Sequence, residues 1–296
     1  MAHQPRKPVV LVTGATGQVG GAIVRLLAAR TDLDVVLAVR SPEKAAHFGL
    51  PVVEMDYDRP ETLLPALQGV DVAFLMTGYT IDMLRQSKSF IDDARKAGVK
   101  HVVHLGACGP DDTRVPHWGW HQFVERYIEW AGFSFTHLRP EAFMQNLIGY
   151  QGDRAASNGV LSSHFADARL SWVDCEDVAA VAVECLARPD RHNGQVYRLG
   201  YDAKTHADIA GILTEELGQP FRYVPRPPEE VLESITNGLE PAYMRSIYEH
   251  FVMHGRKEIP GADEVFDNFE NITGRKPVTI RDFVRKHEAK FRYRHP

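Results

Sequence analysis

The stretch that decides the fold runs from Pro8 to Arg40 and reads PVVLVTGATGQVGGAIVRLLAARTDLDVVLAVR. Its first apolar run, PVVLVT, has no polar alternation, which is typical of a parallel strand buried on both faces. Gly14, Gly17 and Gly20 then follow at three-residue intervals, directly before an amphipathic helical run. Glycines in this context allow a sharp turn and a close approach of the backbone to a pyrophosphate. The stretch therefore predicts a dinucleotide site.

The loop and the start of this helix hold the candidate phosphate contacts. Gly14 would make the turn and Thr16 offers a hydroxyl. The N–H groups of Gly17, Gln18 and Val19 would point at the phosphates together with the positive end of the helix dipole. The alternative is a purely structural turn, because glycine also serves turns through its freedom at positive φ. The position between a strand and a helix favours the dinucleotide interpretation.

The end of the second strand indicates which dinucleotide is preferred. An acidic residue there would bind the ribose hydroxyls of NAD, whereas a basic residue accommodates the 2′-phosphate of NADP. The strand ends at Arg40, and Ser41 and Lys44 follow at once. This arrangement predicts NADP(H) in preference to NAD(H). Alternatively, the two cations are ordinary solvated charges at a helix start.

Composition and charge limit the class of protein. The chain has 296 residues, 44% of them hydrophobic and 25% charged, which is ordinary for a globular enzyme. The net charge of −5 is interspersed, which argues against direct nucleic-acid binding. No apolar run approaches 18 residues, so no membrane span is expected. The N-terminus lacks an apolar signal segment and the three cysteines form no C-x-x-C, which together predict a cytoplasmic protein.

Beyond Arg40 the sequence alternates apolar strands with amphipathic helices over short connections. This pattern is typical of a doubly wound parallel sheet, a Rossmann-type α/β fold, in which ligands lie beyond the carboxyl ends of the strands. Asp56 and Tyr57 end the third strand and would meet the adenine, although both could equally be loop residues. Thr77 and Gly78 end the fourth strand and should border the nicotinamide, with Tyr79 next to the substrate.

Two later segments should line the substrate pocket. Residues 117–130 read as a helix with Phe123, Tyr127 and Trp130 on one face. The segment after the sixth strand, around residues 141–150, is rich in large apolar and amide side chains. Within it, Phe143 and Met144 are expected in the pocket, and Asn146 would either orient the substrate or cap a helix.

The domain organisation is expected to be a dinucleotide-binding domain at residues 1–151 and a smaller, mostly helical substrate lobe at 152–296. Gly- and Ser-rich connections begin near residue 152, and later strands should complete the first sheet. The aromatic tail from Pro227 to Pro296 is read as a substrate-side cap, although most of its aromatic residues are expected to pack the lobe itself. A homodimer is compatible with this organisation.

Several motifs together resemble the NmrA-like family of atypical short-chain dehydrogenases/reductases. The motifs are VTGATGQVG, AVRSPEKA, LPALQGVD, ARKAGVKHVVHL, LRPEAFMQN, WVDCEDVA, NGQVYRLG and DIAGILTEELG, in the expected order. The resemblance implies an NADPH-dependent reductase similar to bacterial quinone and azo-dye reductases, acting on a small aromatic substrate. It also leaves open a non-catalytic NADP(H) sensor, because the family includes members that bind the cofactor without turnover and act through a protein partner.

The chain departs from the usual chemistry of short-chain dehydrogenases. None of its ten tyrosines is followed by lysine at the fourth position, so the tyrosine–lysine pair is absent. In the register of the related benzylic ether reductases, His121 stands where their lysine does. It could donate a proton or bind the nicotinamide carboxamide, held and charged by Glu125 one turn later, or it could be a polar helix residue without acid–base work.

The predicted activity is hydride transfer from NADPH to a quinone-like or other conjugated aromatic or carbonyl substrate. His121 and Asn146 are the candidate catalytic residues. His117 and His121 are four residues apart, but no third ligand completes a metal motif, and no metal is predicted.

Overall fold

A computed structural model describes residues 6–149, 155–236 and 238–293. The chain forms two compact units, each drawn from several segments. The first comprises Met1–Gly106, Trp120–Arg139 and Val178–Tyr197, and the second comprises Ala107–Gly119, Pro140–Asp177 and Arg198–Pro296. The domain boundary expected between residues 151 and 152 lies outside the described residues.

The first unit is built around a seven-stranded sheet in the order β11-β6-β5-β4-β1-β2-β3. Strands β1 to β6 pair in parallel, and the order reverses next to β1, which creates the switch point beside which doubly wound sheets bind ligands. The predicted fold class is confirmed. The strands are β1 (Val9–Thr13), β2 (Asp34–Val39), β3 (Val52–Glu54), β4 (Val72–Leu75), β5 (His101–Leu105), β6 (Ser134–Pro140) and β11 (Gln195–Leu199).

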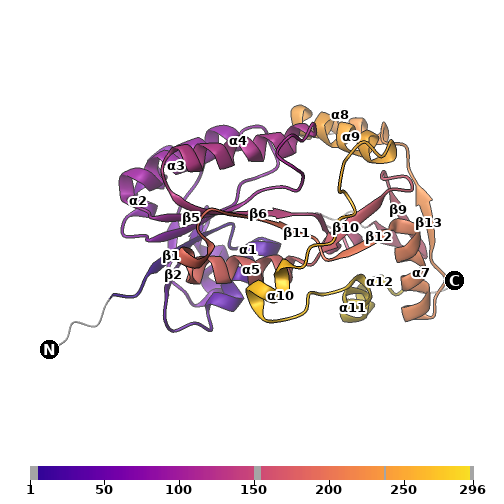
Figure 1. The fold of residues 1–296 in the computed structure, drawn as a ribbon, viewed down its shortest axis with the longest axis horizontal. Helices are drawn as coiled ribbons and strands as arrows, with labels where there is room; N and C mark the ends of the chain where they lie inside the picture. The colour runs from indigo at the N-terminus through magenta and orange to yellow at the C-terminus, as the bar shows by residue number, and fades with distance from the viewer. Residues whose placement is uncertain (1–5, 150–154, 237, 294–296) are drawn as a thin grey trace. The chain divides into compact units, whose positions relative to one another are not determined.

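Helices cover both faces of this sheet (Figure 1). On one face lie α2 (Leu63–Leu67), α3 (Met83–Ala97) and α4 (Pro116–Trp130), and on the other α1 (Gln18–Leu27) and α5 (Cys175–Ala187). Phe90, Ile91 and Ile128 are fully buried in the core that joins α3 and α4 to the sheet. Phe123 and Trp130 were expected on one helix face, and their side chains are 70% and 79% exposed.

The second unit adds two small three-stranded sheets to the expected helices. The sheets are β12-β10-β7 and β13-β9-β8. Their strands are β7 (Ala142–Phe143), β8 (Ala156–Ser157), β9 (Val160–Ser163), β10 (Arg169–Val173), β12 (Asp202–Thr205) and β13 (Arg222–Pro225), and the helices are α7 (His206–Leu217), α8 (Glu230–Thr236), α9 (Pro241–Gly255), α10 (Asn268–Thr273), α11 (Ile280–Lys286) and α12 (Glu288–Phe291).

Helix α7 shows how the sequence sets the ends of an element. The hydroxyl of Thr205 accepts the N–H of Asp208, and the Asp208 carboxylate accepts the N–H of Thr205. The helix ends at Gly218, which has a φ of 63° that disfavours a side chain. Threonine and glycine are residue types that favour these two positions.

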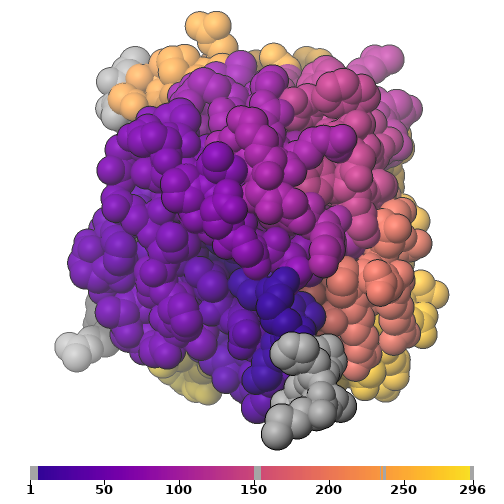
Figure 2. Space-filling model, turned by 90° about the vertical axis from the view of Figure 1, so that its left-hand side faces the viewer, coloured from indigo at the N-terminus to yellow at the C-terminus, as the bar shows by residue number. Residues whose placement is uncertain are grey.

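The outer surface of the first unit is seen in Figure 2, in indigo to magenta. Within the described residues, no helix combines the length and apolarity needed to cross a membrane. The cysteines Cys108, Cys175 and Cys185 are free thiols.

Candidate active site

The glycine loop after β1 leaves the start of α1 open. Gly14 has a φ of 64° and its carbonyl accepts the N–H of Gly17 at 2.9 Å, which makes a tight turn. A Cβ added to Gly20 would lie 2.1 Å from the Gly14 oxygen, so only glycine allows the helix to approach the loop this closely. Gly17 caps α1 without any side-chain hydrogen bond. The first N–H groups of α1 are therefore left for an anionic ligand.

The ends of β1 and β4 are tied together beside this loop. The Thr13 hydroxyl donates to the Phe74 carbonyl and accepts the Met76 N–H, both at 2.9 Å. Next along the chain, the Thr77 hydroxyl is buried and has no hydrogen-bond partner among the residues the structure describes. A buried hydroxyl in this state is satisfied when a ligand supplies a partner. Thr77 and Gly78 thus stand at the carboxyl end of β4, where the sequence placed them.

The end of β2 presents two cations. Arg40 directly follows β2, and Lys44 ends the short 3-10 turn η1 (Pro42–Lys44). Both side chains are exposed, and neither makes a hydrogen bond or ion pair within the described ranges. Ser41 lies between them and is half-buried. The three residues can therefore meet a phosphate without first giving up another partner.

Asp56 and Tyr57 each form a hydrogen bond with a backbone group of the first unit. Asp56 accepts the N–H of Asp58 at 3.0 Å, as in a local turn. The Tyr57 hydroxyl donates to the Met76 carbonyl at 2.9 Å, and its ring meets Phe90 edge-on. Burial raises the pKa of the Tyr57 phenol. Through this hydrogen bond the Tyr57 side chain supports the segment that follows β4.

His121 and Glu125 lie on the face of α4 that covers the sheet, but they do not pair. Both Glu125 oxygens accept from Arg139 of β6, at 2.9 and 2.5 Å. The expectation that Glu125 holds and charges His121 is therefore wrong, because the guanidinium takes the carboxylate. Instead, His121 Nδ1 lies 3.4 Å from His104 Nε2. Burial lowers the pKa of His121 to about 4, so its imidazole is neutral at pH 7.

The substrate residues expected around position 145 belong to the second unit. Phe143 is half-buried in β7, and Met144 is fully buried in the unit's apolar core. Gln145 donates to Asp174 and accepts the Cys175 N–H, so it caps α5. Asn146 is exposed and caps no helix in the described part of the chain, which excludes one of its two expected roles. In the first unit, Tyr79 is 56% exposed.

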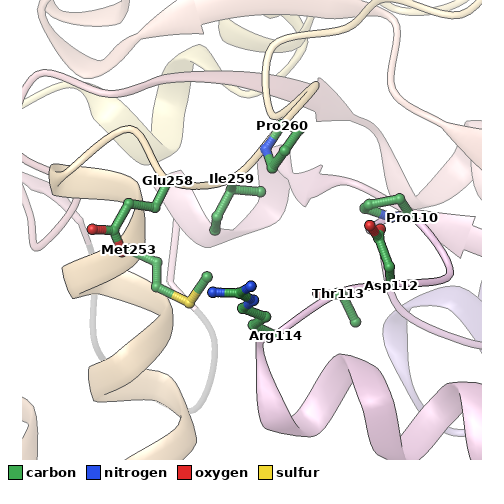
Figure 3. A pocket seen from close by; sticks show the side chains of 8 residues that line it. All are labelled: Pro110, Asp112, Thr113, Arg114, Met253, Glu258, Ile259 and Pro260. Atoms are coloured by element: carbon green, nitrogen blue, oxygen red, sulfur yellow. The ribbon is translucent and has the colours of Figure 1, made fainter.

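A pocket of ≈ 390 Å³ lies in the second unit (Figure 3). The Arg114 guanidinium points into it, with the side chains of Met253 and Ile259 beside it. None of the candidate catalytic residues lines this pocket. Its lining consists of Pro110, Asp112, Thr113, Arg114, Met253, Glu258, Ile259 and Pro260.

Three buried polar residues of the sheet, of which His104 contacts His121 and Arg139 contacts Glu125, were not singled out from the sequence. His104 lies in β5, and His137 and Arg139 lie in β6, all at most 3% exposed. The two-residue spacing of His137 and Arg139 indicates one face of a strand. Their contact with α4 joins segments far apart in the sequence, so periodicity alone could not reveal it.

The sheet order and the glycine-lined start of α1 define a dinucleotide-binding α/β protein of the Rossmann class. The chain belongs to the NmrA-like family, whose profile matches residues 6–284. The resemblance found in the motifs is thereby confirmed over almost the whole chain.

Individual relatives are oxidoreductases by name. An NAD(P)H azoreductase of Xenophilus azovorans is 31% identical over 289 residues, covering 96% of this chain and 99% of the relative. A (4-alkanoyl-5-oxo-2,5-dihydrofuran-3-yl)methyl phosphate reductase of Streptomyces griseus is 30% identical, with coverage of 96% and 99%. The solved NADPH-dependent quinone oxidoreductase of Escherichia coli shares the fold, with a TM-score of 0.80 at 24% identity and coverage of 94% and 99%.

Proposed function

We propose that this protein is an NAD(P)H-dependent reductase that transfers hydride to a quinone-like or other conjugated aromatic or carbonyl substrate. The observation that carries the proposal is the open N-terminus of α1 behind the glycine loop. The named relatives support it, since an azo bond and a conjugated furanone both accept hydride. A bound NAD(P)H would supply that hydride.

Different residues of the first unit bind different parts of the cofactor. The N–H groups of Gln18 and Val19 hold the pyrophosphate, assisted by the Thr16 hydroxyl and the turn at Gly14. The Gly17 N–H was expected to join them but donates to the Gly14 carbonyl, so Gly17 contributes through the close backbone approach that it allows. Arg40, Ser41 and Lys44 favour a 2′-phosphate and hence NADPH over NADH, because two exposed cations, neither in an ion pair with any described residue, surround that position. Asp56 and Tyr57 shape the adenine end, and Thr77 and Gly78 the nicotinamide end.

His121 acts as a neutral hydrogen-bond donor and proton source for the substrate. Its low pKa leaves the imidazole uncharged at pH 7, so it donates a ring proton only as negative charge develops on the substrate. We keep Tyr79, Phe143 and Asn146 as proposed substrate contacts, with Met144 supporting Phe143 from within the core. The substrate is a small aromatic molecule. That the protein forms a homodimer is a separate prediction, which light scattering would test.

The test is steady-state oxidation of NADPH and NADH in the presence of azo compounds and quinones. We expect acceptor-dependent oxidation, faster with NADPH at low cofactor concentration. His121→Ala should lower turnover while the dissociation constant of NADPH stays the same. Tight NADPH binding with no turnover of any acceptor would contradict the proposal and indicate the non-catalytic sensor instead.

A further inference from the structure

The interface between α4 and the sheet holds an unexpected row of polar side chains. Helix–sheet interfaces in doubly wound folds are normally apolar, because both elements bury their hydrophobic faces there. On α4, His121, Glu125 and Glu129 are spaced by four residues and so share one face. On the sheet, His104 of β5 stands directly opposite His137 of β6 in the parallel register. Ionisable groups thus meet where apolar packing is the rule.

The distances in this row connect His121 to the protein surface. His121 Nδ1 and His104 Nε2 are 3.4 Å apart. A ring nitrogen of His104 and one of His137 lie within 4.8 Å of each other, a separation that one bridging water or a small ring rotation can close. His137 Nε2 lies 3.3 Å from a carboxylate oxygen of Glu129.

The two ends of the row are more exposed to solvent than its middle. His104 and His137 are 1% and 0% exposed. The Glu129 side chain is 24% exposed, and it also pairs with Arg126, which is half exposed. His121 is partly exposed at the other end. The row therefore runs from solvent at Glu129, through two buried imidazoles, to the candidate catalytic residue.

A metal site is the competing explanation, because His104, Glu125 and His137 offer three ligand atoms close together. Arg139 opposes it. Both Glu125 oxygens already accept from this guanidinium, so a divalent cation there would face a fixed positive charge and a carboxylate already in use. Imidazoles without a metal remain able to pass protons from one ring nitrogen to the other.

We propose that Glu129, His137, His104 and His121 form a proton path that resupplies His121 from solvent during substrate reduction. The inference rests on the proposed reductase function. When an azo bond accepts hydride at one nitrogen, the other nitrogen takes a proton, so a substrate N–H bond forms as a His121 N–H bond breaks. Each imidazole then gains a proton at one nitrogen and loses one at the other, and the last comes from solvent at Glu129. One nicotinamide cofactor is oxidised and one solvent proton is consumed per azo bond reduced to a hydrazine.

The activity test compares an acceptor that needs a proton with one that does not. An azo compound needs one, whereas a cationic triphenylmethane dye becomes neutral on accepting hydride alone. We expect His104→Gln to slow azo reduction about 100-fold and to leave dye reduction unchanged. The control is His101→Gln, a buried histidine of the same strand whose ring nitrogens lie 2.7 and 3.1 Å from the hydroxyls of Ser134 and Thr136; it should affect neither reaction.

A second readout uses the free protein and no turnover. Solvent exchange of the ring N–H protons of His104, followed by NMR with ¹⁵N-labelled histidine, should slow at least about tenfold in Glu129→Gln if protons enter there. His101→Gln should not change this exchange. Unchanged exchange in Glu129→Gln, or equal loss of both activities in His104→Gln, would overturn the path while leaving the reductase function intact. A wild-type protein that reduces neither acceptor would refute the proposed function itself.

Discussion

The change Gly20→Ala tests the glycine loop most sharply. A Cβ at this position would lie 2.1 Å from the Gly14 oxygen and 2.6 Å from its carbonyl carbon, both of them backbone atoms. Side-chain Cβ atoms essentially never approach closer than 3.0 Å, so α1 must move away from the loop by at least 0.9 Å, the difference between 3.0 and 2.1 Å. Overpacking of this kind costs about 1–3 kcal/mol, against a gain in helix propensity of about 1 kcal/mol.

The neighbouring Gly21→Ala is a matched control on the same helix. Its added Cβ would meet the Ala15 oxygen at 3.4 Å, an ordinary contact, so only the gain in helix propensity remains. We expect urea unfolding to show Gly20→Ala less stable than Gly21→Ala, and calorimetry to show NADPH bound about tenfold or more weakly only by Gly20→Ala. Equal stability and equal NADPH affinity in the two variants would refute this account of the loop.

Three further predictions concern charge. Arg40→Ala should weaken NADPH binding about 10-fold or more and NADH binding little, since one charge-assisted contact is lost; equal loss for both cofactors in a titration would contradict its role. Arg139→Leu removes both close hydrogen bonds of the buried Glu125 carboxylate and leaves it the more distant Arg126 at 3.8 Å, so it should lower the free energy of unfolding by about 3–5 kcal/mol, much of it recovered when Glu125→Leu is added, as a double-mutant cycle in urea would show. Stability should fall as the pH falls from 6.5 towards 4, because burial lowers the pKa of several histidines to about 4 and the unfolded chain then binds more protons than the folded one. Glu141 and Asp177, whose pKa burial raises to about 7 and 6, act in the opposite direction but are fewer. Higher stability near pH 4 would contradict the prediction. The histidines are His101, His121, His206 and His254.

The fold was predictable where the signal is local. The apolar run before Gly14 and the amphipathic run after Gly17 each identify their element from a single window, and the glycine spacing connects them. The capping residues Thr205 and Gly218 act on their own helix and were equally readable. Two-residue strands such as β8 (Ala156–Ser157) carry no period that a window could detect, so the complete small sheets of the second unit could not be predicted from the sequence.

The details of the site depend on partners far apart in the sequence. Glu125 pairs with Arg139 across a helix and a strand, although Glu125 one turn after His121 suggested a different partner. Tyr57 donates to Met76, nineteen residues later, which makes it a support of the loop. Residue type and spacing identified these as polar groups near a ligand site, but only tertiary packing decides which polar group each one meets.

The central claim is direct hydride transfer to a conjugated acceptor. The most direct measurement is reduction of a triphenylmethane dye or a conjugated furanone by NADPH carrying deuterium at one of its two C4 positions, because the new carbon–hydrogen bond does not exchange with solvent. We expect deuterium in the product from only one of the two labelled positions, detected by mass spectrometry. Saturable NADPH binding with no reduced product, or a product free of deuterium from both labels, would contradict the account.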